Sequence, residues 1–175
     1  MFVFLDFEAS SLARQSYPIE VGWVDESGAG EGHLIRPAPG WIDWDERAAA
    51  VHGISRDQLL REGEPHDAVC ERLLAVFARS EVLAGAPSWD GHWLSMLLRA
   101  AGHPRHLVRL RDSEEAFIAA ARARLGPGAA GTSIAALVEE IRRSVEAEPA
   151  SHRALADARR EWSIWRRIAL PPPQD

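Results

Sequence analysis

The chain has 175 residues with 46% hydrophobic content, a formal net charge of −6 and a single cysteine, Cys70. A chain of this length predicts one globular domain over residues 1–170 with a substantial core. The net negative charge excludes a basic surface that binds nucleic acid non-specifically, although it permits a local basic groove. One cysteine excludes an intramolecular disulfide and a multi-cysteine zinc site. The sequence shows neither a leader-like segment nor an apolar run of about 18 residues, so we expect a soluble, cytoplasmic protein that does not contact membranes.

The first third of the chain is typical of β-strands. Three β-rich runs, at residues 1–8, 19–25 and 31–37, are separated by polar or glycine-bearing turns. The segment DESGAGEG between the second and third runs is the clearest hairpin signal. We therefore expect three sequential antiparallel strands.

Helical periodicity begins after the loop RPAPGWIDWDE, where Ser55 and Gln58 match a capping box. The expected elements that follow are a helix at 66–79, a strand at 81–86, a helix at 89–102, a strand at 106–112, a helix capped by Ser113, and helices at 132–146 and 152–168. Three antiparallel strands followed by alternating strands and helices predict an α/β domain, a mixed five-stranded sheet with helices on its faces. The segment PPPQD at 171–175 predicts a disordered tail.

Two acids end the first strand. Asp6 and Glu8 stand at strand period, so both leave the same face, with Cα atoms about 6.7 Å apart. Other acid-x-acid pairs occur at Asp43/Asp45, Glu62/Glu64, Asp112/Glu114 and Glu146/Glu148. Those pairs fall in loops or at helix starts, where water or the helix dipole accounts for them. Asp6 and Glu8 follow the apolar FVFL on an expected central strand, so either a positive group compensates them or the strand end has reached water.

Two later acids fit the same pattern. Asp90 opens a helix directly after a strand, and Asp157 lies five residues after His152. The segments FLDFEASSL, LAGAPSWDGHWL and HRALAD resemble the three motifs of the DEDDh exonucleases, the DnaQ-like branch of the RNase H-like superfamily. AAAVHGIS, residues 48–55, is similar to the segment that follows the third strand in that family. The resemblance covers the chain from end to end.

The resemblance implies an RNase H-like fold and a metal-dependent 3′–5′ exonuclease. Its partner would be single-stranded or 3′-overhanging nucleic acid, and its products nucleoside 5′-monophosphates. Asp6, Glu8, Asp90 and Asp157 would be catalytic residues that hold two Mg²⁺ (or Mn²⁺) ions, with Asp6 bridging both. Oxygen-only ligands favour these ions over zinc, and four acids about 4 Å apart repel by about 1 to 4 kcal/mol per pair without them.

His152 would be the general base of such an enzyme. Residues five apart on a regular helix differ by about 140°, so His152 shares the face of Asp157 only if it lies in a loop before the helix. The resemblance also implies substrate contacts by Ala9, Ser10, Ser11, Leu12, His52 and Ile54. Two family positions differ, because Ser11 stands where a glycine is usual and Ala86 where an asparagine is usual.

A different class of function fits the same fold, a catalytically weak nucleic-acid or nucleotide-binding module. Clustered, mutually repelling acids count against it, because a pure binder gains nothing from them. The choice among DNA, RNA and short oligonucleotides stays open, as does the oligomeric state, although several single-domain relatives form homodimers.

Aromatic and basic residues give weaker signals. Helical spacing predicts that Trp89, Trp93, Trp162 and Trp165 lie in the core, whereas Trp41 and Trp44 flank a loop where either packing or base stacking is open. Arg105, Arg109 and Arg111 fit phosphate contacts or a solvated strand edge equally well. Because all 20 basic residues are arginine, arginine richness alone says little about phosphate binding.

Overall fold

The computed structural model describes residues 1–145 and 151–170. Its centre is a mixed sheet with the strand order β4-β3-β2-β1-β5-β6. The strands are β1 (Phe2–Ala9), β2 (Pro18–Asp25), β3 (Gly30–Arg36), β4 (Glu64–Pro65), β5 (Glu81–Ala84) and β6 (Leu110–Asp112). The first three are antiparallel neighbours, and β5 and β6 run parallel to β1, which confirms the expected mixed sheet. The expected tail at 171–175 lies outside the described residues.

The sheet has one strand more than the sequence predicts. The two-residue β4 pairs in parallel with β3 at its outer edge. A Cβ on Gly63 would lie only 2.7 Å from the backbone nitrogen of Arg36, so glycine permits the approach that forms this pair. Strands this short have too few residues for a period to be recognised.

The helices follow the predicted alternation. They are α1 (Glu46–His52), α2 (Arg56–Glu62), α3 (His66–Phe77), α4 (Pro87–Ala100), α5 (Ser113–Leu125), α6 (Gly131–Val145) and α7 (Ala154–Ala169). Ser55 caps α2 by accepting a hydrogen bond from the backbone N–H of Gln58. The cap predicted for α5 is wrong, because Asp112 accepts from the backbone of Glu114 while Ser113 is the first helical residue. In the described residues, no helix combines the length and apolarity needed to cross a membrane.

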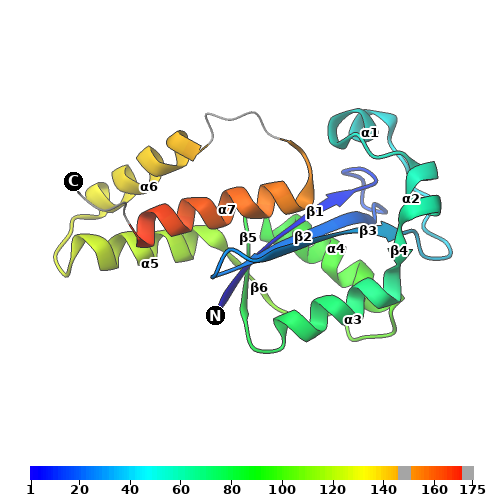
Figure 1. The fold of residues 1–175 in the computed structure, drawn as a ribbon, viewed down its shortest axis with the longest axis horizontal. Coiled ribbons are helices and arrows are strands. Elements are labelled where there is room, and N and C mark those ends of the chain that lie inside the picture. The colour runs from blue at the N-terminus through cyan, green and yellow to red at the C-terminus, as the bar shows by residue number, and fades with distance from the viewer. Residues whose placement is uncertain (146–150, 171–175) are drawn as a thin grey trace.

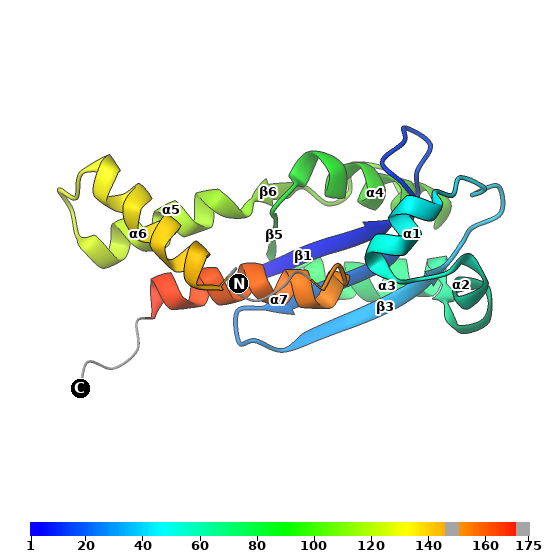
Figure 2. The ribbon, with the colours of Figure 1, turned by 90° about the horizontal axis from the view of Figure 1, so that it is seen from above.

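Two hydrophobic layers cover the sheet (Figures 1 and 2). One joins α3 and α4 to the face that carries Leu5 and Phe7, and the other joins α5, α6 and α7 to the face that carries Phe4. Because side chains alternate along a strand, Asp6 and Glu8 leave β1 on the same face as Phe4, under α7. Figure 2 shows α1 and the β1–β2 loop beyond the far end of β1.

Gly22 brings α7 close to this face. It pairs with Asp6 across β1 and β2, and a Cβ there would lie 2.2 Å from the backbone nitrogen of Leu155. Any side chain would therefore push the first turn of α7 away from the sheet. The glycine lets that turn lie directly beside the acidic end of β1.

Candidate active site

Three of the predicted acids meet at the end of β1. One carboxylate oxygen from each of Asp6, Glu8 and Asp157 lies within 4.8 Å of the others. Asp90, in the first turn of α4, is close enough for its charge to act on the pKa of Asp6. The end of β1 and the helices α4 and α7 thus bring the four acids of the three motifs to one place.

Burial and mutual repulsion raise the pKa values of this cluster. Burial raises the pKa of Asp6 well above its usual value, and the charges of neighbouring carboxylates, Asp90 first, raise it further. Burial, followed by the charge of Asp157, raises the pKa of Glu8 to about 7. The pKa of Asp90 is also raised to about 7 by burial, although backbone hydrogen bonds oppose the shift. Without a cation, the cluster retains protons near neutral pH.

The donor set fits hard divalent cations. Asp90 is 2% exposed, and its Oδ2 atom has no hydrogen-bond partner among the described residues. An unpaired carboxylate oxygen in the interior is costly unless a cation or a proton compensates it. Asp157 is partly compensated, because Nη1 of Arg160 lies 3.0 Å from its Oδ1. A set made only of carboxylate oxygens suits Mg²⁺ or Mn²⁺.

Glu20 is a residue of this site that the sequence motifs do not contain. It lies opposite Glu8 on β2 and is 5% exposed. Arg153 binds it through Nε and Nη2, the latter at 2.6 Å, and the backbone N–H of Ala154 donates to its Oε2 at 3.0 Å. Glu20 therefore anchors the first turn of α7, and its sequence signal was an acid inside a buried strand.

Glu161 is a second such residue, one turn after Asp157 on α7. It accepts a hydrogen bond from Ser113, and burial raises its pKa. Its charge contributes to the raised pKa values of Asp6 and Asp90, so it faces the same cluster. The i, i+4 spacing from Asp157 is the only sequence signal for it.

His152 lies in the loop directly before α7, is exposed, and has a left-handed backbone with φ 47°. His52 is near it, at the end of α1, and is buried. Burial lowers the pKa of His52, and the charge of His152 lowers it further by a smaller amount. His52 Nδ1 accepts from the backbone of Ile54, and its Nε2 has no partner among the described residues.

The predicted substrate contacts occupy different environments. The hydroxyls of Ser10 and Ser11 both donate to Asp43 Oδ2, at 2.9 and 2.6 Å, and so hold the β1–β2 loop against the loop before α1. Leu12 is 72% exposed, whereas Ile54 is 1% exposed and packs in a buried cluster. Ala9 is also buried. Only Leu12 presents its side chain freely to solvent.

The predictions for the tryptophans and the arginines differ in outcome. Trp89 was expected in the core but is 40% exposed, where its ring stacks on Trp93, which lies one turn later on α4 and is 6% exposed. Arg111 lies at a solvated strand edge, paired with Glu81 and Glu115. Trp162 and Trp165 pack against the core beneath α7 as predicted.

The strand order and the helix layers define an RNase H-like fold. E. coli exonuclease I in its zinc-bound complex with single-stranded DNA has this fold, with a TM-score of 0.68 at 16% identity over 97% of this chain and 41% of that chain. Its complex with a dA16 oligonucleotide gives 0.68 at 14% identity over 97% and 41%, and an apo exonuclease I gives 0.67 at 14% over 97% and 42%. This chain spans about two fifths of the length of those chains. No protein-family model and no curated protein matches the sequence.

Proposed function

We propose that this protein is a divalent-metal-dependent 3′–5′ exonuclease of the DEDDh type. The observation that carries the proposal is the meeting of Asp6, Glu8 and Asp157 within 4.8 Å, beside the buried Asp90, on a nuclease fold. A binding module would be destabilised by these repelling acids without benefit from them. The single-stranded DNA bound in the similar exonuclease I structures supports the substrate class.

Asp6, Glu8, Asp90 and Asp157 would hold two Mg²⁺ or Mn²⁺ ions. When bound, such ions stabilise the charge that develops on a phosphodiester during in-line displacement by water. The carboxylates give up their protons to bind them, so the raised pKa values of Glu8 and Asp90 make metal affinity increase through about pH 7.

His152 would take the proton from the attacking water. Its loop is exposed and directly precedes α7, so the imidazole can approach a substrate at the carboxylate cluster. Glu20 and Arg153 fix the end of that loop by their ion pair and by the hydrogen bond to Ala154. The anchor holds His152 and Asp157 in one register while leaving the imidazole itself free of packing.

The test is hydrolysis of single-stranded DNA and RNA 12-mers with Mn²⁺, with Mg²⁺ and in EDTA. We expect nucleoside 5′-monophosphates in either metal and none in EDTA, with turnover abolished in Asp157→Asn. A 12-mer that is bound but never cleaved would instead support the binding module. Comparing 5′- with 3′-labelled strands establishes the end from which cleavage proceeds.

A further inference from the structure

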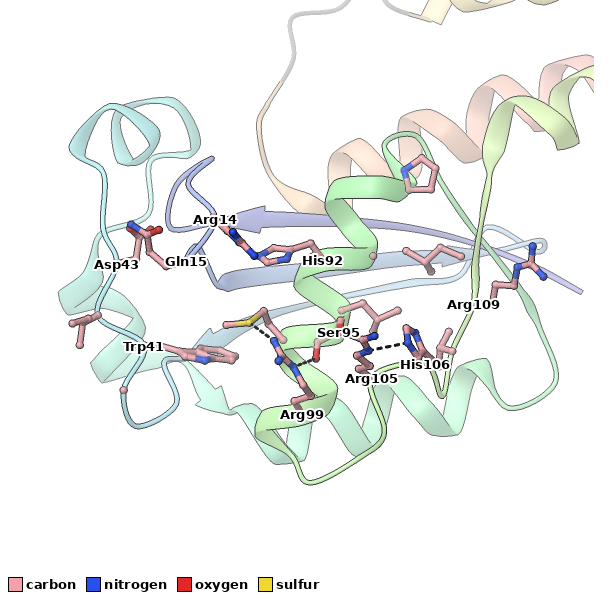
Figure 3. Close-up of a pocket in the computed structure, with 18 residues that line it drawn as sticks. Arg14, Gln15, Trp41, Asp43, His92, Ser95, Arg99, Arg105, His106 and Arg109 are labelled. Carbon is pink, nitrogen blue, oxygen red and sulfur yellow. Dashed lines mark hydrogen bonds between the residues drawn. The ribbon is translucent and has the colours of Figure 1, made fainter.

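A groove of about 830 Å³ runs along the exposed side of α4 (Figure 3). Four separate segments form its walls: the β1–β2 loop, the loop before α1, α4 itself and the loop between α4 and β6. The charged and aromatic side chains of the lining include Arg14, Trp41, His92, Arg99, Arg105 and Arg109. Figure 3 shows the side chains of Arg14, Arg99 and Arg105 gathered around α4.

The groove is basic in an acidic protein. Its four arginines are all exposed, and among the described residues none of them forms an ion pair with a carboxylate. Arg99 donates only to Ser95 and Met96 of its own helix. Asp43 is the one acid in the lining, and the hydroxyls of Ser10 and Ser11 already occupy its Oδ2.

Some exposed arginines elsewhere in the described residues pair with a carboxylate, whereas others, such as Arg122 and Arg143, do not. Arg72 pairs with Glu31, for example, at 2.5 Å. Since every basic residue of this chain is arginine, the number of arginines in the groove is not informative. The informative observation is the local balance of charge: four arginines without a carboxylate partner line one hollow in which Asp43 is the single acid, which leaves their charge available to an anionic partner.

The groove lies along the helix that supplies Asp90 to the carboxylate cluster. Pro87 and Gly91, which flank Asp90 in the first turns of α4, belong to its lining. A second hollow shares Arg14 and His92 with the groove and adds exposed apolar surface next to the β1 end. The two hollows therefore adjoin at Arg14 and His92, beside the first turns of α4.

We propose that this groove holds the phosphodiester backbone of a single-stranded nucleic acid on the 5′ side of the bond to be cleaved. Only the polarity of the bound strand, with its 5′ side in the groove, rests on the proposed function. From Gly91 to Arg99, α4 rises by about 12 Å, which matches three to four nucleotides of a stacked strand at about 3.4 Å each. One face of the Trp41 ring stacks on Tyr17, so a base can stack only on the part of the ring that lines the groove.

The experiment measures binding of a 5′-labelled 12-mer by fluorescence anisotropy in EDTA, over a series of NaCl concentrations. Arg99→Ala, Arg105→Ala and the double variant are compared with Arg122→Ala and Arg143→Ala, exposed arginines on the opposite layer of helices. Each groove substitution should weaken binding several-fold and make the slope of log K against log[NaCl] shallower by about 0.7. The two control variants should bind as the parent does.

Because binding is measured in EDTA, the groove is tested independently of catalysis. With Mn²⁺, the groove variants should raise KM for the 12-mer more than KM for a dinucleotide, which is too short to span the groove. Nucleic-acid binding in the groove would be contradicted if the groove variants bound as tightly as the parent. It would also be contradicted if polyglutamate competed as well as an oligonucleotide of equal charge. Either result would leave the nuclease proposal intact. Weakened binding in variants of a protein that never cleaves would uphold the groove and overturn the nuclease.

Discussion

At the residue scale, the cluster around Asp6 is destabilising when no cation is bound. The folded chain desolvates Asp6, Glu8 and Asp90 and sets them close to further negative charge, and the raised pKa values record the free energy involved. An arrangement of this kind is typical of functional sites, where stability is exchanged for affinity toward a ligand. The same residues should therefore respond in opposite ways to pH and to metal.

The pH dependence of stability follows from the sign of these shifts. Glu8 has a folded pKa of about 7 against about 4.3 in an unfolded chain, so the stability it contributes is full below about pH 4 and is lost as pH rises through 7. In EDTA, Glu8→Gln should gain Tm over the parent between pH 4 and pH 7, with the gain level above that. Glu140→Gln, at an exposed position of α6, should follow the parent throughout.

Excess Mn²⁺ should reverse this order, because the ion stabilises the parent cluster and not the glutamine variant. Thermal melts at four pH values, with and without metal, provide the comparison. A Glu8→Gln protein that is less stable than the parent in EDTA at pH 8 would show that the carboxylate is a structural group.

For His152, substitution should separate proton transfer from metal binding. We expect His152→Ala to lower the single-turnover rate by about 10² to 10⁴ with little change in Mn²⁺ affinity, since the side chain is exposed and acts only on the attacking water. His103→Ala, in the loop after α4, is the control and should stay within twofold of the parent. If His152→Ala also stayed within twofold, the general base would have to be another group.

The four acids could be proposed from the sequence because they lie in three short segments that resemble the motifs of a known nuclease family. Glu20 and Glu161 could not be found that way. Glu20 becomes part of the site only through the register of β2 against β1 and the position of α7, and Glu161 through the contact between α5 and α7. Those are tertiary relations between residues far apart in the chain.

At the element scale, the geometry of the cluster depends on how closely α7 approaches the sheet. The contact is possible because Gly22 has no Cβ, and Glu20 then fixes the first turn of the helix by accepting from Ala154. One short stretch of β2 thus determines how far Asp157 stands from Asp6.

Gly22→Ala should therefore damage both stability and metal binding. The new Cβ would meet the backbone of Ala154 and Leu155 at 2.2 to 2.4 Å, and helix backbone cannot yield without moving α7. We expect a loss of about 1 to 3 kcal/mol in the free energy of unfolding and weaker Mn²⁺ binding by calorimetry. Gly131→Ala, where nothing lies within 4 Å of an added Cβ, should change neither. Unaltered metal binding in Gly22→Ala would mean that the position of α7 does not control the site.

Element types were predictable where the period is long, as in β1 and α7. The helix α1 was not predicted, because its seven residues are too few for a period and its start is hidden in a loop rich in tryptophan and proline. Asp45 caps it, and Gly53 ends it in a left-handed conformation. The cap of α5 was misassigned because Asp112 and Ser113 are both good capping residues, and the choice between them depends on the contact of Ser113 with Glu161.

At the scale of the whole molecule, the single sheet joins two hydrophobic layers, and the cluster lies where elements from both layers meet. Asp90 comes from the α3/α4 layer and Asp157 from the α5–α7 layer, while Asp6 belongs to the strand between them. We propose that residues 1–170 fold as one cooperative unit, because separating the layers would break the sheet core on both faces.

This proposal predicts coincident unfolding transitions. Tryptophans report on both layers, Trp23 and Trp93 on one and Trp162 and Trp165 on the other. Denaturant curves from tryptophan fluorescence and from far-UV circular dichroism should superimpose with one midpoint. Two midpoints would indicate that the layers unfold separately, and the metal site would then require both to be folded.

The most direct test of the proposed metal site is a crystal soaked in Mn²⁺ and measured for anomalous scattering. We expect two anomalous peaks between the end of β1 and the first turn of α7, with oxygen ligands from Asp6, Glu8, Asp90 and Asp157. Asp6→Asn crystals grown and soaked in the same way should lose at least one of the peaks. Parent crystals with no ion among these four carboxylates, or with ions bound only elsewhere, would contradict the proposed metal site.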